Sequence, residues 1–139
     1  MVVVDASVLT AFYAADDPRR ATVVARLCAG DAFFAPAHMD AEVLSALRGL
    51  SQRFPTVRSA VPGALRHLAQ IPIRRMPLAG LLSRMWELRE NVTPYDAAYV
   101  ALAEELGAPV VTCDSTLTTA SGPRCEFELI SGPVPPRAP

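Results

Sequence analysis

Short apolar runs without polar alternation recur along the chain. Residues 2–4, 32–35 and 109–112 each consist almost entirely of consecutive apolar residues. Such a run predicts a strand that is buried on both faces, as in a parallel sheet covered by helices. Longer stretches with apolar residues three and four positions apart lie between the runs and predict helices. This alternation predicts an α/β fold with right-handed crossovers.

The predicted architecture is a three-layer α/β/α sandwich with a mainly parallel sheet of four or five strands. The expected strands are 2–5, 32–35, 72–76, 109–112 and an edge strand at 126–130. The expected helices are 8–14, 18–29, 39–50, 57–70, 79–90 and 94–106, with a short helical turn at 115–119. Because a proline in a helix interior breaks the hydrogen-bond ladder, Pro62-Gly63 is a candidate start of a new helix within 57–70.

Acidic residues follow two of the buried strands. Asp5 comes directly after the first strand, and Asp114 follows the 109–112 strand after one intervening residue. Parallel strands end at the same edge of a sheet, and this edge is where open α/β sheets bind ligands. We therefore expect both carboxylates at this edge.

Two helices bring further acids to the same edge. Thr93-Pro94 suits the cap and the first position of a helix that carries Asp96 in its first turn. This helix leads directly into the 109–112 strand, so its first turn returns to the carboxyl edge of that strand. The 39–50 helix leaves from the same edge with Glu42 in its first turns.

Carboxylates gathered at a buried edge repel each other and lose hydration, which is costly unless a cation or protons neutralise them. Each acid has a simpler explanation alone, since Asp5 suits the cap of a helix that begins near Ser7. Asp96 is a common residue at helix starts, and Glu42 alone reads as surface. Because four separate elements deliver acids to one place, the pattern favours a metal site.

Four segments carry a family resemblance, namely residues 2–7 (VVVDAS), 41–48 (AEVLSALR), 93–103 (TPYDAAYVALA) and 111–114 (VTCD). Together they resemble PIN-domain nucleases and, more narrowly, VapC-type toxin ribonucleases of type II toxin–antitoxin pairs. The resemblance runs from Met1 to about Ile130. We therefore expect a PIN-like nuclease domain at 1–130 and a proline-rich flexible tail at 131–139.

The resemblance implies a metal-dependent endoribonuclease whose acidic site uses Mg²⁺, with Mn²⁺ as a substitute. It assigns the catalytic and metal-binding roles to four acids and supporting roles to two hydroxyl residues: Asp5, Glu42, Asp96 and Asp114, with Thr112 and Ser7. Water attack assisted by two metals, or by one, would leave a 5′-phosphate and a 3′-hydroxyl. Many relatives carry a further aspartate shortly after the last acid, whereas this chain has no acid at Leu117. The alternative is a catalytically degenerate PIN module that serves as an RNA- or protein-binding scaffold.

The charge distribution adds a candidate RNA path. The net charge is −1, but the segment from Val43 to Trp86 contains seven arginines and no acid, so the remainder carries −8. A basic segment beside an acidic metal site would attract RNA phosphates. Arg48 and Arg53 are the best candidates, because they continue the helix that carries Glu42. The chain has no lysine, so a compositional preference for arginine and a solvated basic surface are the alternative.

Other residues bound the function further. No apolar run approaches the roughly 18 residues of a membrane span and no signal peptide is visible, so the expected location is cytoplasmic. The three cysteines form neither a metal-binding spacing nor an even disulfide set, and Cys28 is expected in a helix core. Only two histidines, His38 and His67, argue against a histidine-driven ribonuclease. The missing lysine argues against haloacid-type phosphatases and receiver domains.

The resemblance also implies macromolecular partners, which are a cognate antitoxin protein, an RNA substrate and a second copy of the chain in a homodimer. The predicted 79–90 helix has a nearly continuous apolar surface around four residues: Leu81, Leu82, Met85 and Trp86. Large exposed apolar faces usually mark partner sites. We therefore expect this helix to be a candidate partner surface.

Overall fold

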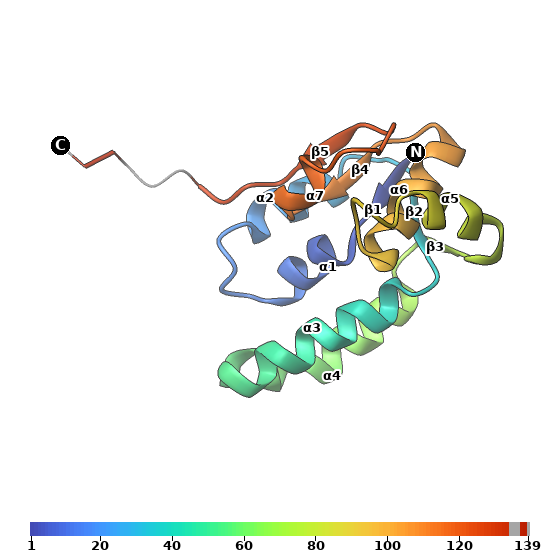
Figure 1. Ribbon diagram of the computed structural model, residues 1–139. Helices are drawn as coiled ribbons and strands as arrows, with labels where there is room; N and C mark the ends of the chain where they lie inside the picture. The colour runs from blue at the N-terminus through green and yellow to red at the C-terminus, as the bar shows by residue number, and fades with distance from the viewer. Residues whose placement is uncertain (134–136, 139) are drawn as a thin grey trace.

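Five parallel strands form the centre of the protein in the order β3-β2-β1-β4-β5, in a computed structural model that describes residues 1–133 and 137–138 (Figure 1). The strands are β1 (Val2–Val4), β2 (Phe33–Pro36), β3 (Ile73–Met76), β4 (Val110–Thr112) and β5 (Phe127–Leu129). All residues of β1 and β4 are buried, as the apolar runs predict. The parallel α/β prediction is confirmed.

The central strand β1 pairs with β2 on one side and with β4 on the other. The chain moves outward from β1 to β2 and β3, and then returns past β1 to form β4. The strand order therefore reverses between β1 and β4, at the kind of switch point where α/β sheets bind ligands. Ile130 extends the pairing of β5 with β4 by one residue, because its N–H donates to the carbonyl oxygen of Thr112 at 2.8 Å.

Helices connect the strands and cover the sheet (Figure 1). They are α1 (Ala6–Tyr13), α2 (Arg20–Leu27), α3 (Met39–Arg53), α4 (Pro55–Gln70), the 3₁₀ helix η1 (Ala79–Leu81), α5 (Leu82–Glu87), α6 (Pro94–Leu106) and α7 (Ser115–Thr118). Right-handed crossovers place α1 to α4 on one face of the sheet, and α5 and α6 on the other. Helices α3 and α4 lie side by side as a long antiparallel pair (Figure 1).

Two predicted helices need correction. The 79–90 helix is wrong as a single element, because η1 precedes a short α5 that ends at Glu87. The carbonyl oxygen of Leu88 accepts the N–H groups of both Asn91 and Val92, which forms a turn instead of further helix. Pro62 does not start a new helix, since α4 continues through it. The buried face of α4 packs on both sides of Pro62 and outweighs one lost hydrogen bond.

The ends of several other elements differ from expectation by one to three residues. The first helix begins at Ala6 instead of residue 8, α2 begins at Arg20 instead of residue 18, and α3 continues to Arg53. Cys28 is exposed, not in a helix core, because it follows the last residue of α2. The expected flexible tail includes residues 134–136 and 139, which lie outside the described residues. Within the described part, no helix has the length and apolar character that crossing a membrane requires.

Candidate active site

Asp5 lies at the carboxyl end of β1 and is only 6% exposed. Its Oδ2 atom accepts hydrogen bonds from Ser7 Oγ at 2.6 Å and from Thr112 Oγ1 at 2.8 Å. Asp5 occupies the N-cap position of α1, but its side chain makes no capping hydrogen bond, so the explanation of this acid as a helix cap is wrong. Burial raises the pKa of Asp5, although the two hydroxyl groups partly oppose this effect.

The two hydroxyl residues also hold the turn that follows β4. Thr112 Oγ1 accepts the backbone N–H of Asp114 at 3.0 Å, and Ser7 Oγ accepts the backbone N–H of Cys113 at 2.9 Å. Each hydroxyl therefore donates to Asp5 and accepts from the segment that carries the next acid. This arrangement ties the ends of β1 and β4 together.

Asp114 begins α7 and acts as its cap. Its Oδ1 atom accepts the backbone N–H of Thr116 at 2.9 Å and also the Thr116 hydroxyl. Leu117, three residues further on, is buried against Leu88 and Val100 in a small apolar cluster. Position 117 therefore serves packing, which is consistent with the absence of an acid there.

The side chain of Glu42, in the first turns of α3, reaches across to contact α6. Its Oε1 atom accepts a hydrogen bond from Tyr99 Oη at 2.7 Å and lies 3.0 Å from His38 Nε2. Burial raises the pKa of Glu42, but these two contacts outweigh burial and leave the pKa below its usual value. Sequence reasoning missed the Tyr99 contact. The available signal was its position three residues after Asp96, on the same helix face.

Asp96 lies in the first turn of α6, where its backbone N–H donates to Thr93 Oγ1 at 3.2 Å, so the predicted helix start is confirmed. Burial and the charges of Asp5, Asp114 and Glu42 raise the pKa of Asp96 to about 6. The structure therefore brings the four predicted acids close enough to act on one another electrostatically.

In three of these carboxylates, side-chain hydrogen bonds reach only one of the two oxygens. Side-chain donors contact Asp5 at Oδ2, Glu42 at Oε1 and Asp114 at Oδ1. The other oxygen of each group receives no side-chain hydrogen bond within the described residues. These oxygens are the ligand type that hard divalent cations prefer, so the donor set fits Mg²⁺ or Mn²⁺. In the described part of the chain, no three such groups converge as a ready-made cage, so water would have to complete the coordination.

Arg48 and Arg53 are exposed on α3, and neither makes an ion pair with another described residue. Arg48 borders a groove of about 490 Å³ between α3 and α4. The basic segment is less available than its sequence suggests, because Arg75 pairs with Asp40. Arg84 is likewise bound to two glutamates, one in α5 and one in α6.

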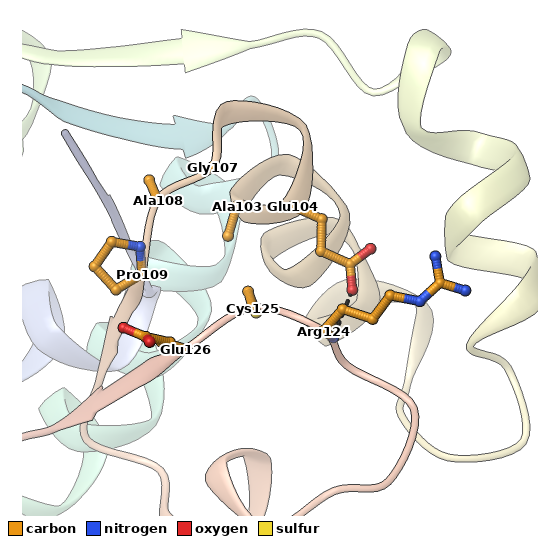
Figure 2. A pocket seen from close by; sticks show the side chains of 8 residues that line it. All are labelled: Ala103, Glu104, Gly107, Ala108, Pro109, Arg124, Cys125 and Glu126. Carbon is orange, nitrogen blue, oxygen red and sulfur yellow. Dashed lines mark hydrogen bonds between the residues drawn. The ribbon is translucent and has the colours of Figure 1, made fainter.

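A second pocket, of about 430 Å³, lies away from the acids (Figure 2). Pro109 and Glu126 line it directly before β4 and β5, so it lies at the amino edge of the sheet. Figure 2 shows the Glu104 carboxylate beside Arg124, whose backbone N–H donates to it at 2.7 Å. Glu104 is also held by Arg84 at 2.7 Å, so this acid is already neutralised within the fold.

Comparison with known proteins identifies the family to which the chain belongs. The sequence pattern of the PIN domain family matches residues 2–122. Ribonuclease VapC12 of Mycobacterium tuberculosis is 37% identical over 131 residues, which cover 94% of this chain and 100% of the relative. Ribonuclease VapC3 of the same organism is 42% identical over 119 residues, or 86% of each chain.

Solved structures share the fold. The crystal structure of VapC20 of Mycobacterium tuberculosis, a toxin described as cleaving the sarcin-ricin loop, has a TM-score of 0.66 at 20% identity, covering 84% of this chain and 92% of that one. PAE2754 from Pyrobaculum aerophilum has a TM-score of 0.59 at 25% identity, covering 84% and 82%. Given the family match and these relatives, the chain belongs to the PIN-domain family, among the VapC-type nucleases.

Proposed function

We propose that the protein is a Mg²⁺- or Mn²⁺-dependent endoribonuclease that acts as the toxin of a toxin–antitoxin pair in the cytoplasm. The observation that carries this proposal is the acid cluster at the switch point of the sheet. Three of its carboxylates are held through one oxygen only, and burial together with the neighbouring carboxylates raises the pKa of the fourth. The relatives VapC3 and VapC12 bear the name ribonuclease, which supports RNA as the substrate.

Asp5, Asp96 and Asp114 would be the principal metal ligands, with Glu42 binding directly or through water. When bound, the metal would activate water and stabilise charge on the phosphate during in-line hydrolysis. Ser7 and Thr112 fix Asp5 by occupying one of its oxygens, so the other keeps a defined direction. With no fifth acid at Leu117, we expect a first metal to bind more tightly than a second.

RNA would approach along the exposed arginines of α3, while protein partners would use apolar surface. Arg48 lies about 9 Å along the helix axis from Glu42, close enough to contact a phosphate neighbouring the one that is cut. Leu82 and Trp86 of α5 are 56% and 68% exposed, so this helix remains our candidate surface for the antitoxin or a second copy. Leu81, expected in the same surface, is buried instead.

The test is cleavage of RNA by purified protein, with products mapped by sequencing RNA ends. Cleavage should stop in EDTA, return with Mg²⁺ or Mn²⁺, and be absent in Asp5→Asn. Glu105→Gln, an exposed acid on α6, is the matched control and should cleave normally. Undiminished cleavage in EDTA would contradict the metal mechanism. Binding without cleavage in any divalent metal would support the scaffold alternative.

A further inference from the structure

An apolar pocket of about 280 Å³ adjoins the acidic site. It is lined by His38, Leu78, Met85, Pro94 and Tyr95. Three of these residues come from the elements that carry two of the acids, because His38 directly precedes α3, and Pro94 and Tyr95 begin α6. The pocket therefore lies beside Glu42 and Asp96, and the hydrolytic mechanism proposed above does not use it.

Tyr95 gives this pocket an exposed aromatic wall. The residue is 63% exposed, whereas Tyr99, one turn later on the same helix, is fully buried. The Tyr95 ring lies 5.9 Å from the ring of His38, measured between centroids, at an interplanar angle of 45°. The two rings are therefore tilted neighbours, and the Tyr95 ring remains accessible to a planar ligand.

His38 adds polar atoms at the same place. Its Nε2 atom faces Glu42, and Nδ1 lies on the opposite side of the imidazole ring. Both nitrogens are buried. Nε2 lies 3.0 Å from Glu42 Oε1, whereas Nδ1 has no hydrogen-bond partner within the described residues. Buried polar atoms nearly always have a partner, so Nδ1 leaves His38, a residue of the pocket wall, with one unused hydrogen-bonding atom.

We propose that this pocket binds one nucleobase of the RNA substrate, next to the phosphate that is cut. The inference rests on the proposed ribonuclease function. A nucleotide joins a charged phosphate to a planar base, and the structure places an acidic cation site beside a small aromatic pocket. The volume of about 280 Å³ is just below the roughly 300–1,000 Å³ of sites for drug-sized ligands, which suits a single base.

The wall chemistry favours a base over other groups. The lining has no arginine or lysine to hold a phosphate, and its aliphatic and aromatic side chains suit a flat, weakly polar ring. Proteins that read single-stranded RNA splay out bases and stack them on aromatic side chains, with hydrogen bonds to the base edge. Tyr95 is the stacking residue in this arrangement, and the His38 ring lies beside it.

The test combines a protein change with an RNA change. The probe is a ten-nucleotide single-stranded RNA that spans a cleavage position mapped for the wild type, together with versions that carry one abasic residue at each position near the cut. Binding is measured in Ca²⁺ by fluorescence anisotropy, and cleavage rates are measured in Mg²⁺. Tyr95→Ala is compared with Tyr95→Phe, which keeps the ring, and with Leu129→Ala, which removes an exposed apolar side chain of β5 outside the pocket.

Base stacking predicts that Tyr95→Ala weakens binding of the intact RNA by about 5- to 150-fold. Tyr95→Phe and Leu129→Ala should bind it normally. One abasic position should weaken wild-type binding by a similar factor and should have little effect on Tyr95→Ala, because both changes remove the same contact. An unchanged melting temperature would establish that the variant is folded.

The alternatives give different results. Suppose that the wild type cleaves RNA, but the losses of affinity from Tyr95→Ala and from the abasic position are absent or are independent, so that their factors multiply. The proposal of a base-binding pocket is then wrong, while the ribonuclease function stands. If Tyr95→Ala changes only the oligomeric state in size-exclusion chromatography, the pocket is a protein contact and the proposal is overturned. If the wild type neither binds nor cleaves any RNA, the proposed function fails first.

Discussion

Replacing Asp96 by asparagine should stabilise the metal-free protein at neutral pH while abolishing cleavage. Its pKa is raised from 3.8 to about 6, first by burial and then by Asp5, Asp114 and Glu42. A folded-state pKa above the unfolded value means that the folded protein binds the proton more tightly. Stability is therefore lost as pH rises from about 4 to about 6, and the loss persists at pH 7 without metal.

The size of the effect follows from the shift. A change of about two pKa units corresponds to at most about 3 kcal/mol, at about 1.4 kcal/mol per unit. The Asp96 side chain is only half-buried, so solvent screening reduces this figure to about 1 kcal/mol. For a chain of this length, that corresponds to a melting temperature about 4 °C higher in Asp96→Asn at pH 7.

The assay is thermal unfolding in EDTA between pH 4 and pH 7, for wild type, Asp96→Asn and the exposed-acid control Glu105→Gln. The Asp96→Asn difference should appear as pH rises through this window and be nearly absent at pH 4, while the control tracks the wild type. Added Mg²⁺ should stabilise the wild type more than Asp96→Asn. A variant that melts several degrees below the wild type at pH 7, or a difference independent of pH, would refute the electrostatic reasoning.

Four further substitutions test other parts of the structure. Arg48→Ala and Arg53→Ala should each reduce the slope of log affinity against log salt concentration by roughly 0.7, measured with single-stranded RNA in Ca²⁺. The control is Arg74→Ala, which lies at the amino edge of the sheet. A slope that is unchanged and equal to that of the control would remove α3 from the RNA path. Tyr99→Phe should lower the free energy of unfolding in urea by about 1 to 3 kcal/mol, because it removes a buried hydrogen bond to Glu42, and a change below about 0.5 kcal/mol would contradict this. Pro62→Ala should raise the free energy of unfolding by about 2 kcal/mol, because alanine restores a helical N–H, although it also gives the unfolded chain more conformational entropy. An unchanged free energy of unfolding would mean that α4 is already adapted to the proline.

The strand-end acids could be predicted because their positions depend on chain direction alone. Asp5 and Asp114 follow apolar runs, and parallel strands must end at one edge. The start of α6 was equally predictable, because Thr93 and Pro94 have strong and specific capping preferences.

Contacts between distant elements could not be predicted. The bond from Tyr99 to Glu42 depends on how α6 and α3 lie across the sheet, and no local pattern encodes that. The end of α5 depends on a single carbonyl, that of Leu88, which accepts two N–H groups. Pro62 shows the converse, because local propensity argues for a break and the packing of α4 overrides it.

The pairing of β1 with β4 has a consequence for how the protein is made. Thr112, which holds the Asp5 carboxylate, lies 107 residues after it, so their contact forms only after these 107 residues have been made. At the usual speed of a ribosome, roughly 5 to 20 residues per second, the interval is roughly 5 to 20 seconds. Throughout it, β1 has an open edge on the side that β4 will occupy, and the acid cluster lacks Asp114. A nascent chain therefore completes its acid cluster only after β4 and Asp114 have been made, and chains truncated before β4 carry only Asp5, Glu42 and Asp96.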